Sequence, residues 1–190
     1  VKLEDGSILR LGEDTAAAFG LRAGMDLGEE RLAEIASAAR AADLRAQAAG
    51  MAGRRALSRR ELEQKLQRRG AEEEEIRAAA DWLEDLGAID DAAYARLVAR
   101  HYGDRGYGPG RVREELRRRG VPRAFWDDAL AELPDSGEAI RAFLEKKAPA
   151  GLADPRERKR LADALLRRGF SWEEIRPALD ALGRDEEDWH

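Results

Sequence analysis

The sequence predicts an all-α protein of three tandem three-helix repeats that form an elongated, curved array, with a small N-terminal β-hairpin and helix in front. One observation behind this prediction is an Arg-Arg-Gly triplet that ends at Gly70, Gly120 and Gly169, at separations of 50 and 49 residues. A second is that apolar residues around the three glycines match in position, and a third is a charge pattern with the same period. Self-similarity at such a period indicates small helical units that stack on their neighbours.

Alignment on the three glycines brings apolar or small residues into register 8 and 4 residues before the glycine and 6, 9 and 13 residues after it. Spacings of three and four residues place side chains on one face of a helix. The five positions hold Leu62, Val112 and Leu161; Leu66, Leu116 and Leu165; Ile76, Trp126 and Ile175; Ala79, Ala129 and Ala178; and Leu83, Leu133 and Leu182. We expect these residues to form the core of each repeat.

Each repeat is predicted to contain a first helix, a tight turn at the glycine and a second helix. The glycine suits the position after a helix, where the backbone turns left-handed. Ser58 with Glu61 has the form of a capping box, as does the Ser-Trp-Glu-Glu run at 171–174. Asp154 before Pro155 marks another helix start.

A third helix is predicted to close each of the first two repeats. One begins at Asp90 or Asp91 and carries Tyr94, and the other begins near Asp135. The third repeat ends at about residue 183 in an acidic tail. This interpretation divides the chain into repeats at 54–105, 106–149 and 150–190.

The first 53 residues differ from the repeats and are predicted to form a separate arm. Asp5-Gly6 is a two-residue turn signal between two short runs, which predicts a β-hairpin over residues 1–11. Asp14 is a candidate cap for a short helix. Asp26-Leu-Gly-Glu29 is expected to open a longer, alanine-rich helix that runs to about Gln47, and residues 50–53 are interpreted as the joint into the repeats.

Composition excludes several classes of protein. The 190 residues contain no cysteine, so disulfides and thiolate metal sites are excluded. No apolar run approaches the roughly 20 residues that a membrane helix needs, and no charged start leads into an apolar core. The sequence therefore predicts a soluble, cytoplasmic protein. No phosphate-binding glycine loop, nucleophile elbow or metal-ligand spacing is present, so we expect neither enzymatic activity nor a cofactor.

The charge pattern follows the repeat. Charged residues make up 38% of the chain, although the net charge is only −5. First helices are basic and second helices acidic: residues 51–70 sum to +5 and residues 71–91 to −8. Arginines at the end of a helix and acids at the start of the next complement the helix dipoles. That explanation does not cover six arginines near predicted helix starts, because cations there are mildly unfavourable. They are Arg54, Arg55, Arg59, Arg60, Arg111 and Arg113.

One block of the sequence is specific enough to indicate a family. Leu66 to Gly70 has the form L-x-x-[KR]-G and precedes Asp90-Asp91 and the pair Tyr94-Ala95. The joint Arg105-Gly106-Tyr107-Gly108 follows, and then a second such motif at Leu116 to Gly120. In this order the segment resembles the RecX family of recombinase modulators, over about residues 55–183, and the chain is identified as a member of it.

The resemblance implies a function. RecX proteins bind the RecA recombinase, in particular its filament on single-stranded DNA. They block filament extension, suppress ATP hydrolysis, strand exchange and co-protease activity, and bind DNA weakly. The resemblance therefore implies a negative regulator of homologous recombination, expected to act as a monomer, with no role at a membrane. A curved array offers an extended surface on which several weak contacts add.

Nine cations and one aromatic residue supply the candidate contacts with the filament or DNA. They are Arg59, Arg60, Lys65, Arg100, Arg105, Tyr107, Arg111, Arg113, Arg117 and Arg118. The alternative is a helix-turn-helix-like DNA-binding or transcriptional regulatory protein. Against sequence-specific reading of DNA stands the acidic second helix of the first repeat, with four consecutive glutamates at 72–75, which phosphates would repel.

Overall fold

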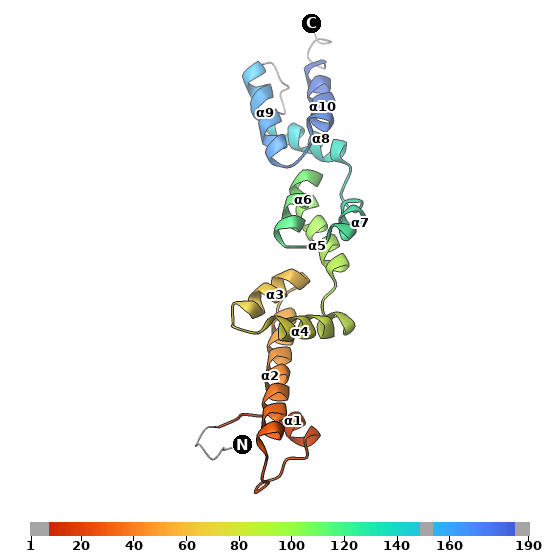
Figure 1. Ribbon diagram of the computed structural model, residues 1–190. Helices are drawn as coiled ribbons and strands as arrows, with labels where there is room; N and C mark the ends of the chain where they lie inside the picture. Colours follow the sequence, from red (N-terminus) through yellow and green to blue (C-terminus); the bar gives the residue numbers. More distant parts are fainter. Residues whose placement is uncertain (1–7, 149–153, 185–190) are drawn as a thin grey trace. The chain divides into compact units, whose positions relative to one another are not determined.

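The computed structural model describes residues 8–148 and 154–184, and its regular structure within these ranges is helical (Figure 1). The prediction of an all-α repeat protein is therefore confirmed. The chain divides after Ile89 into two compact units, and each is described by itself. None of the described helices is long and apolar enough to cross a bilayer.

The predicted N-terminal β-hairpin over residues 1–11 is wrong, because the described part of the chain contains no strand. Residues 1–7 of that segment lie outside the described residues. Leu9–Leu11 are irregular, and the Ile8 side chain is 70% exposed. A two-stranded hairpin is marginal unless a hydrophobic face packs against something, and Ile8 has no such cover.

The first unit contains α1 (Glu13–Ala18), α2 (Glu29–Ala52), α3 (Arg59–Gln67) and α4 (Glu73–Asp85). Helix α2 begins at Glu29, the last residue of the predicted opening, with Gly28 rather than Asp26 as its N-cap, and it continues beyond Gln47 through most of the predicted joint. The reason is its apolar face: Leu44, Ala48 and Met51 follow at helical spacing and pack into one core with α3 and α4. The core of the first repeat thus needs the end of α2.

Helix α3 begins and ends as its sequence predicts. The Ser58 hydroxyl accepts a hydrogen bond from the Glu61 backbone N–H at 3.1 Å, and the Glu61 carboxylate accepts one from the Ser58 N–H at 3.3 Å. Leu62 and Leu66 are fully buried. The chain then turns at Gly70, which has a φ of +84°.

The second unit begins with α5 (Asp91–Gly103), α6 (Pro109–Arg118), the 3-10 turn η1 (Arg123–Phe125) and α7 (Trp126–Leu130), which share one core. The Asp90 side chain caps α5 by accepting from the Ala93 N–H at 2.9 Å. Trp126 is buried and donates its indole N–H to the Val121 carbonyl at 3.0 Å. The sequence grouped α5 with the helices before it, whereas its core contacts are with α6 and α7, which follow it.

The last three helices, α8 (Ser136–Lys147), α9 (Pro155–Arg167) and α10 (Trp172–Arg184), form a third core. Asp135 and Asp154 cap α8 and α9 through their side chains. The capping pair at the start of α10 is present too, with hydrogen bonds in both directions between Ser171 and Glu174. The predicted acidic tail at 185–190 lies outside the described residues.

Within the second unit, the start of α6 lies against the end of α9 through their backbones. The Gly108 N–H donates to the Arg168 carbonyl at 2.8 Å, and the Gly110 N–H donates to the Gly169 carbonyl at 2.9 Å. A Cβ atom at Gly169 would come within 2.1 Å of the Arg111 nitrogen, and its φ is +90°. Glycine is therefore required at this joint by both backbone conformation and space.

Candidate functional site

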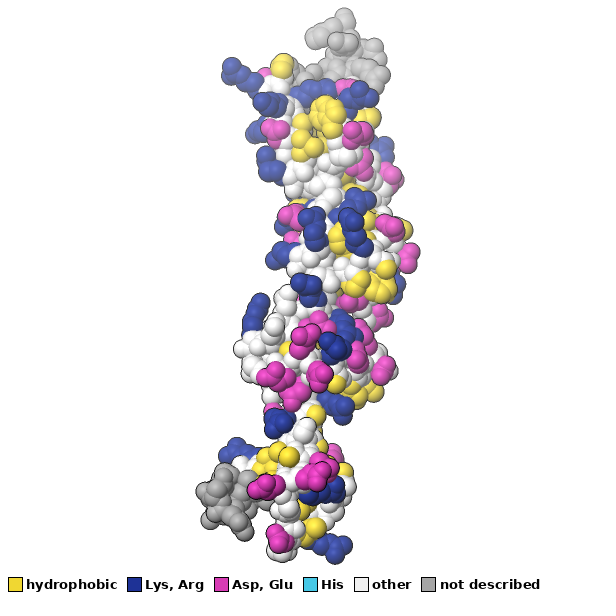
Figure 2. Space-filling model, in the orientation of Figure 1, with side chains coloured by type: hydrophobic (Ala, Val, Ile, Leu, Met, Phe, Trp, Pro, Cys, Tyr) yellow, Lys and Arg dark blue, Asp and Glu magenta, His cyan; other side chains and the backbone are white. Residues whose placement is uncertain are grey.

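Most of the predicted contact residues fall into three local environments. Figure 2 shows cationic and acidic side chains interspersed over the described part of the chain on the face in view. The first environment is the ion-pair network of Arg59, the second is a basic pocket of the first repeat, and the third is the outer face of α6 with its joint to α9.

Arg59 is held inside the first repeat. Its guanidinium contacts Glu63 at 2.8 Å, Asp81 at 2.6 Å and also Glu84, which ties α3 to α4. Burial opposes the charge of Arg59, but hydrogen bonds to these three carboxylates outweigh it, so its pKa is raised. The side chain is 25% exposed. The network explains why an arginine lies at the start of α3 despite the helix dipole.

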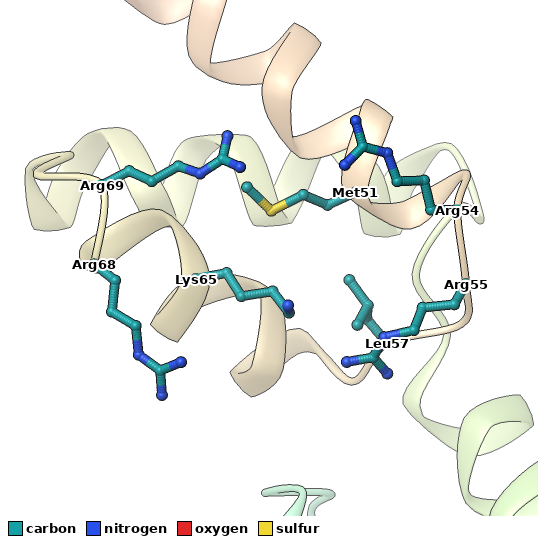
Figure 3. A pocket seen from close by; sticks show the side chains of 7 residues that line it. All are labelled: Met51, Arg54, Arg55, Leu57, Lys65, Arg68 and Arg69. Atoms are coloured by element: carbon teal, nitrogen blue, oxygen red, sulfur yellow. The ribbon is translucent and has the colours of Figure 1, made fainter.

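A basic pocket lies between the end of α2 and the end of α3. It is a hollow of about 420 Å³ lined by five cations and two apolar side chains, which are Met51, Arg54, Arg55, Leu57, Lys65, Arg68 and Arg69. Figure 3 shows Lys65 in the middle of the group, with Arg54 and Arg69 on opposite sides of Met51. Met51 and Leu57 belong to the core and form the apolar lining.

Two of the five cations are tethered at the edge of the basic pocket. Arg69 donates to the Gln47 side-chain oxygen at 2.9 Å, and Arg55 lies 3.6 Å from a Glu61 carboxylate oxygen. Arg54, Lys65 and Arg68 form no ion pair within the part of the chain that is described. Arg60, which lies on the same helix as Lys65, lines a different hollow with polar residues of α3 and α4. The structure thus separates Lys65 from Arg59 and Arg60, its neighbours in the predicted set.

On α6, the arginines surround a buried carboxylate. Glu115 is only 2% exposed, and its oxygens lie 3.0 Å from Arg111, 2.5 Å from Arg118 and 3.5 Å from Arg119. Burial would raise the pKa of Glu115, but hydrogen bonds from Arg118 and Tyr102 and the charge of Arg111 outweigh it and lower the pKa. Sequence reasoning missed Glu115, since a glutamate four residues from an arginine has the pattern of an exposed helix pair.

Two further predicted cations on this helix have no such partner. Arg113 and Arg117 are exposed and four residues apart, so they share a face of α6. Neither forms an ion pair with another described residue. By contrast, Arg100 on α5 contacts Glu132 at 3.0 Å. Arg105 contacts the His101 ring and donates to the His101 carbonyl at 3.2 Å.

Tyr107 lies at the joint between α6 and α9 and is half-buried. Its ring meets Tyr102 edge to face at 5.5 Å, and the Arg168 guanidinium lies 5.3 Å from its centre. Arg168 also donates to the carbonyls of Arg105 and Gly106, each at 3.0 Å. Arg168 was not predicted, because its role depends on a residue more than 60 positions away in the chain.

No group of three or more histidine, aspartate or glutamate side chains among the described residues is arranged to hold a metal ion. The candidate chemistry is therefore that of cations: ion pairing and hydrogen bonding to carboxylates or phosphates.

Comparison with known proteins gives consistent matches. Models of the first, second and third three-helix domains of RecX match residues 45–83, 90–130 and 135–179. These ranges follow the three cores. Regulatory protein RecX from Halorhodospira halophila is 39% identical over 137 residues, covering 70% of this chain and 84% of its own. The protein of that name from Pseudomonas putida is 38% identical over 148 residues, covering 77% and 94%. These relatives are named as regulatory proteins rather than enzymes.

Two crystal structures share the fold. One, of a regulatory protein RecX, superposes with a TM-score of 0.77 at 24% identity and covers 94% of this chain and 92% of that chain. The other, RecX from Lactobacillus salivarius, has a TM-score of 0.65 at 25% identity and covers 74% and 97%.

Proposed function

The chain belongs to the RecX family of regulatory proteins, and on that premise we propose that it binds the RecA filament on single-stranded DNA and inhibits its extension. Inhibition of ATP hydrolysis, strand exchange and co-protease activity follows from the same binding. The observation that carries the proposal is the presence of all three RecX domains in order. The proposal places the protein in the cytoplasm, acting as a monomer.

Repeated units suit a filament, since a filament presents the same site many times. Several weak contacts by linked units add up to tight binding without any one contact being strong. Arg113 and Arg117 are the best-supported contacts of the predicted set, because both are exposed and neither forms an ion pair with a described residue, although the charge of Arg113 also acts on the Glu174 carboxylate. Arg59, Arg111 and Arg118 are already paired internally, so partner binding would compete with those pairs.

Sequence-specific reading of duplex DNA is the less favoured function. The second helix of the first repeat, α4, begins with Glu73, Glu74 and Glu75, and α10 begins with two further acidic residues. A recognition helix with an acidic start would be repelled by phosphates. Weak, salt-sensitive contact of DNA with the basic side chains is compatible with both functions.

The test is RecA's ATP hydrolysis on single-stranded DNA, titrated with this protein well below one copy per recombinase. We expect strong inhibition at that ratio, because one bound copy blocks the growth of a whole filament. The double variant Arg113→Ala with Arg117→Ala is expected to inhibit at least about 30-fold less well, since two lost charged contacts of roughly 1 kcal/mol or more each sum to about 2 kcal/mol or more.

The matched control removes two exposed cations from α8, with Arg141→Ala and Lys146→Ala. It has the same change in net charge and is expected to inhibit like the unaltered protein. No inhibition by the unaltered protein, together with tight and sequence-selective binding to duplex DNA, would contradict the proposal and favour the DNA-binding function.

A further inference from the structure

We propose that the basic pocket of the first repeat binds a nucleoside polyphosphate, with the phosphates held by its cations and the nucleoside against Met51 and Leu57. Such a site is separate from filament binding, because it needs no recombinase to form. It lies wholly within the first unit, between α2 and α3.

Within the described residues, four of the five cations of the basic pocket form no ion pair. Five cations line it, and the only carboxylate recorded against any of them, within the described residues, is Glu61 beside Arg55. Arg69 is tethered by the neutral side chain of Gln47. Positive charges that line one hollow repel one another. A ligand with several negative charges in a small volume would therefore be attracted strongly.

The second repeat provides an internal comparison at the same positions. Five residues before the turn glycine stands Lys65 in the first repeat and Glu115 in the second. The two arginines that precede each glycine are present in both repeats. In the second repeat Arg118 and Arg119 lie on the carboxylate of Glu115. In the first repeat the equivalent arginines, Arg68 and Arg69, line the basic pocket together with the ammonium group of Lys65.

Helix dipoles do not account for this arrangement. Cations near the ends of α2 and α3 do favour the negative ends of both helices. The second repeat has arginines at the end of α6 too, and there the protein supplies its own anion. The first repeat differs in that two helix ends converge on one hollow with a lysine in place of that anion.

The size and lining of the pocket select the class of ligand. A hollow of about 420 Å³ is within the range of small-molecule sites. Guanidinium groups bind phosphate oxygens in pairs, and a lysine adds a point charge. A triphosphate carries several negative charges in a small volume, which matches the positive charges gathered in the pocket. An acidic peptide instead spreads its charge along a chain. Met51 and Leu57 also line the hollow, but they belong to the core and are only 9% and 4% exposed, so they offer a sugar or base a small apolar contact that inorganic phosphate would not use.

The experiment is isothermal titration calorimetry on the full chain, without magnesium, using ATP, inorganic triphosphate, adenosine and a short oligothymidylate in separate titrations. We expect ATP and triphosphate to bind, ATP more tightly because its nucleoside covers the apolar side chains, and adenosine alone not to bind. The double variant Lys65→Gln with Arg68→Gln is expected to weaken ATP binding by roughly 10- to 100-fold, since hydrogen bonds to charged groups are lost.

The control is Arg141→Gln with Lys146→Gln on α8, which makes the same change in charge outside the pocket. It is expected to bind ATP as the unaltered protein does. Arg54→Gln, which follows α2 and is exposed, provides a second pocket variant if the double variant has lost helical content by circular dichroism.

Three outcomes would overturn the proposal. One is the absence of ATP and triphosphate binding. Another is an equal loss of affinity in the α8 control, which would mean general attraction to a charged protein. The third is binding of oligothymidylate through Lys65 and Arg68 without binding of ATP, which would assign the pocket to a nucleic acid strand.

Discussion

The first and second repeats share the same arrangement of helices but differ in whether a carboxylate of the protein pairs with the arginines near the turn. In the second, Glu115 is buried among the arginines of α6 and fixes Arg111 and Arg118. In the first, Lys65 stands at the equivalent position, and the neighbouring arginines line a hollow. The comparison teaches that the apolar register sets the fold of a repeat, while one position near its turn decides whether its cations are satisfied internally or left for a ligand.

The same two repeats also differ in how they can join a neighbour. Gly108 and Gly110 at the start of α6 let its backbone reach the end of α9. Twelve and ten residues before its turn glycine, the first repeat has Ser58 and Arg60 instead. Ser58 is occupied in the capping box of α3. A backbone joint of the α6–α9 kind therefore requires glycines that the first repeat lacks.

The largest expected effect separates the turn glycine of the third repeat, which lies in this joint, from that of the first. Gly169→Ala places a methyl group 2.1 Å from the Arg111 nitrogen, whereas Gly70→Ala meets nothing within 4 Å. Both incur the left-handed strain of a non-glycine residue, about 1–2 kcal/mol. Gly169→Ala adds overpacking of about 1–3 kcal/mol. Urea denaturation followed by circular dichroism measures the difference in the free energy of unfolding.

Gly70→Ala is the matched control, since its φ of +84° is close to the +90° of Gly169. Equal losses of stability in the two variants would contradict the close joint between α6 and α9. A larger loss of stability for Gly70→Ala would mean that the turn of the first repeat is the more tightly constrained of the two.

A smaller effect is expected at the buried carboxylate. Glu115→Gln keeps the shape of the side chain but removes the charge that holds Arg111, Arg118 and Arg119. We expect a loss of about 1–2 kcal/mol at neutral pH, at the lower end for a broken buried pair because the arginines can return to water. Lys65→Gln, at the equivalent position of the first repeat, is expected to change stability by less than about 0.5 kcal/mol.

The effect of Glu115 depends on pH in a direction set by its lowered pKa. A carboxyl with a pKa below its ordinary value of 4.5 stabilises the folded state above that value. This contribution is lost as the pH falls through the lowered pKa. The stabilities of Glu115→Gln and the unaltered protein should therefore differ at neutral pH and converge under acid conditions. A constant difference across that range would rule out the charge as its cause.

The repeat cores were predictable from the sequence because apolar spacing and turn glycines are local signals. Leu62, Leu116 and Leu165 are all buried as the alignment predicts, and Ser58, Asp135 and Asp154 cap the helices that they precede. The candidate cap Asp14 instead lies inside α1, whose N-cap is Gly12. The hairpin prediction failed because a turn signal at Asp5-Gly6 says nothing about whether its strands have a surface on which to pack.

The candidate site was less predictable, because its properties arise between elements. The pairing of Arg59 with Asp81 crosses from α3 to α4, and Arg168 reaches carbonyls in the turn between α5 and α6. The residue types identified the basic helices, but they did not show which cations form ion pairs within the protein. The exchange of Lys65 for Glu115 in aligned repeats was the one signal in the sequence that pointed to the difference between them.

Lys65→Glu tests that exchange with the smallest expected effect on stability. It gives the first repeat the same residue type that the second has at this position. New ion pairs with Arg68 and Arg69 should stabilise by roughly 0.3–0.5 kcal/mol each. A carboxylate near the end of α3 costs about 0.3–1 kcal/mol against the helix dipole. The net change in the free energy of unfolding should therefore lie within about 0.5 kcal/mol, while triphosphate binding measured by calorimetry is abolished.

Arg60→Glu makes the same change in charge on the same helix but outside the pocket, and it should retain triphosphate binding. Retained binding in Lys65→Glu would mean that the position near the turn does not decide how the repeat uses its cations.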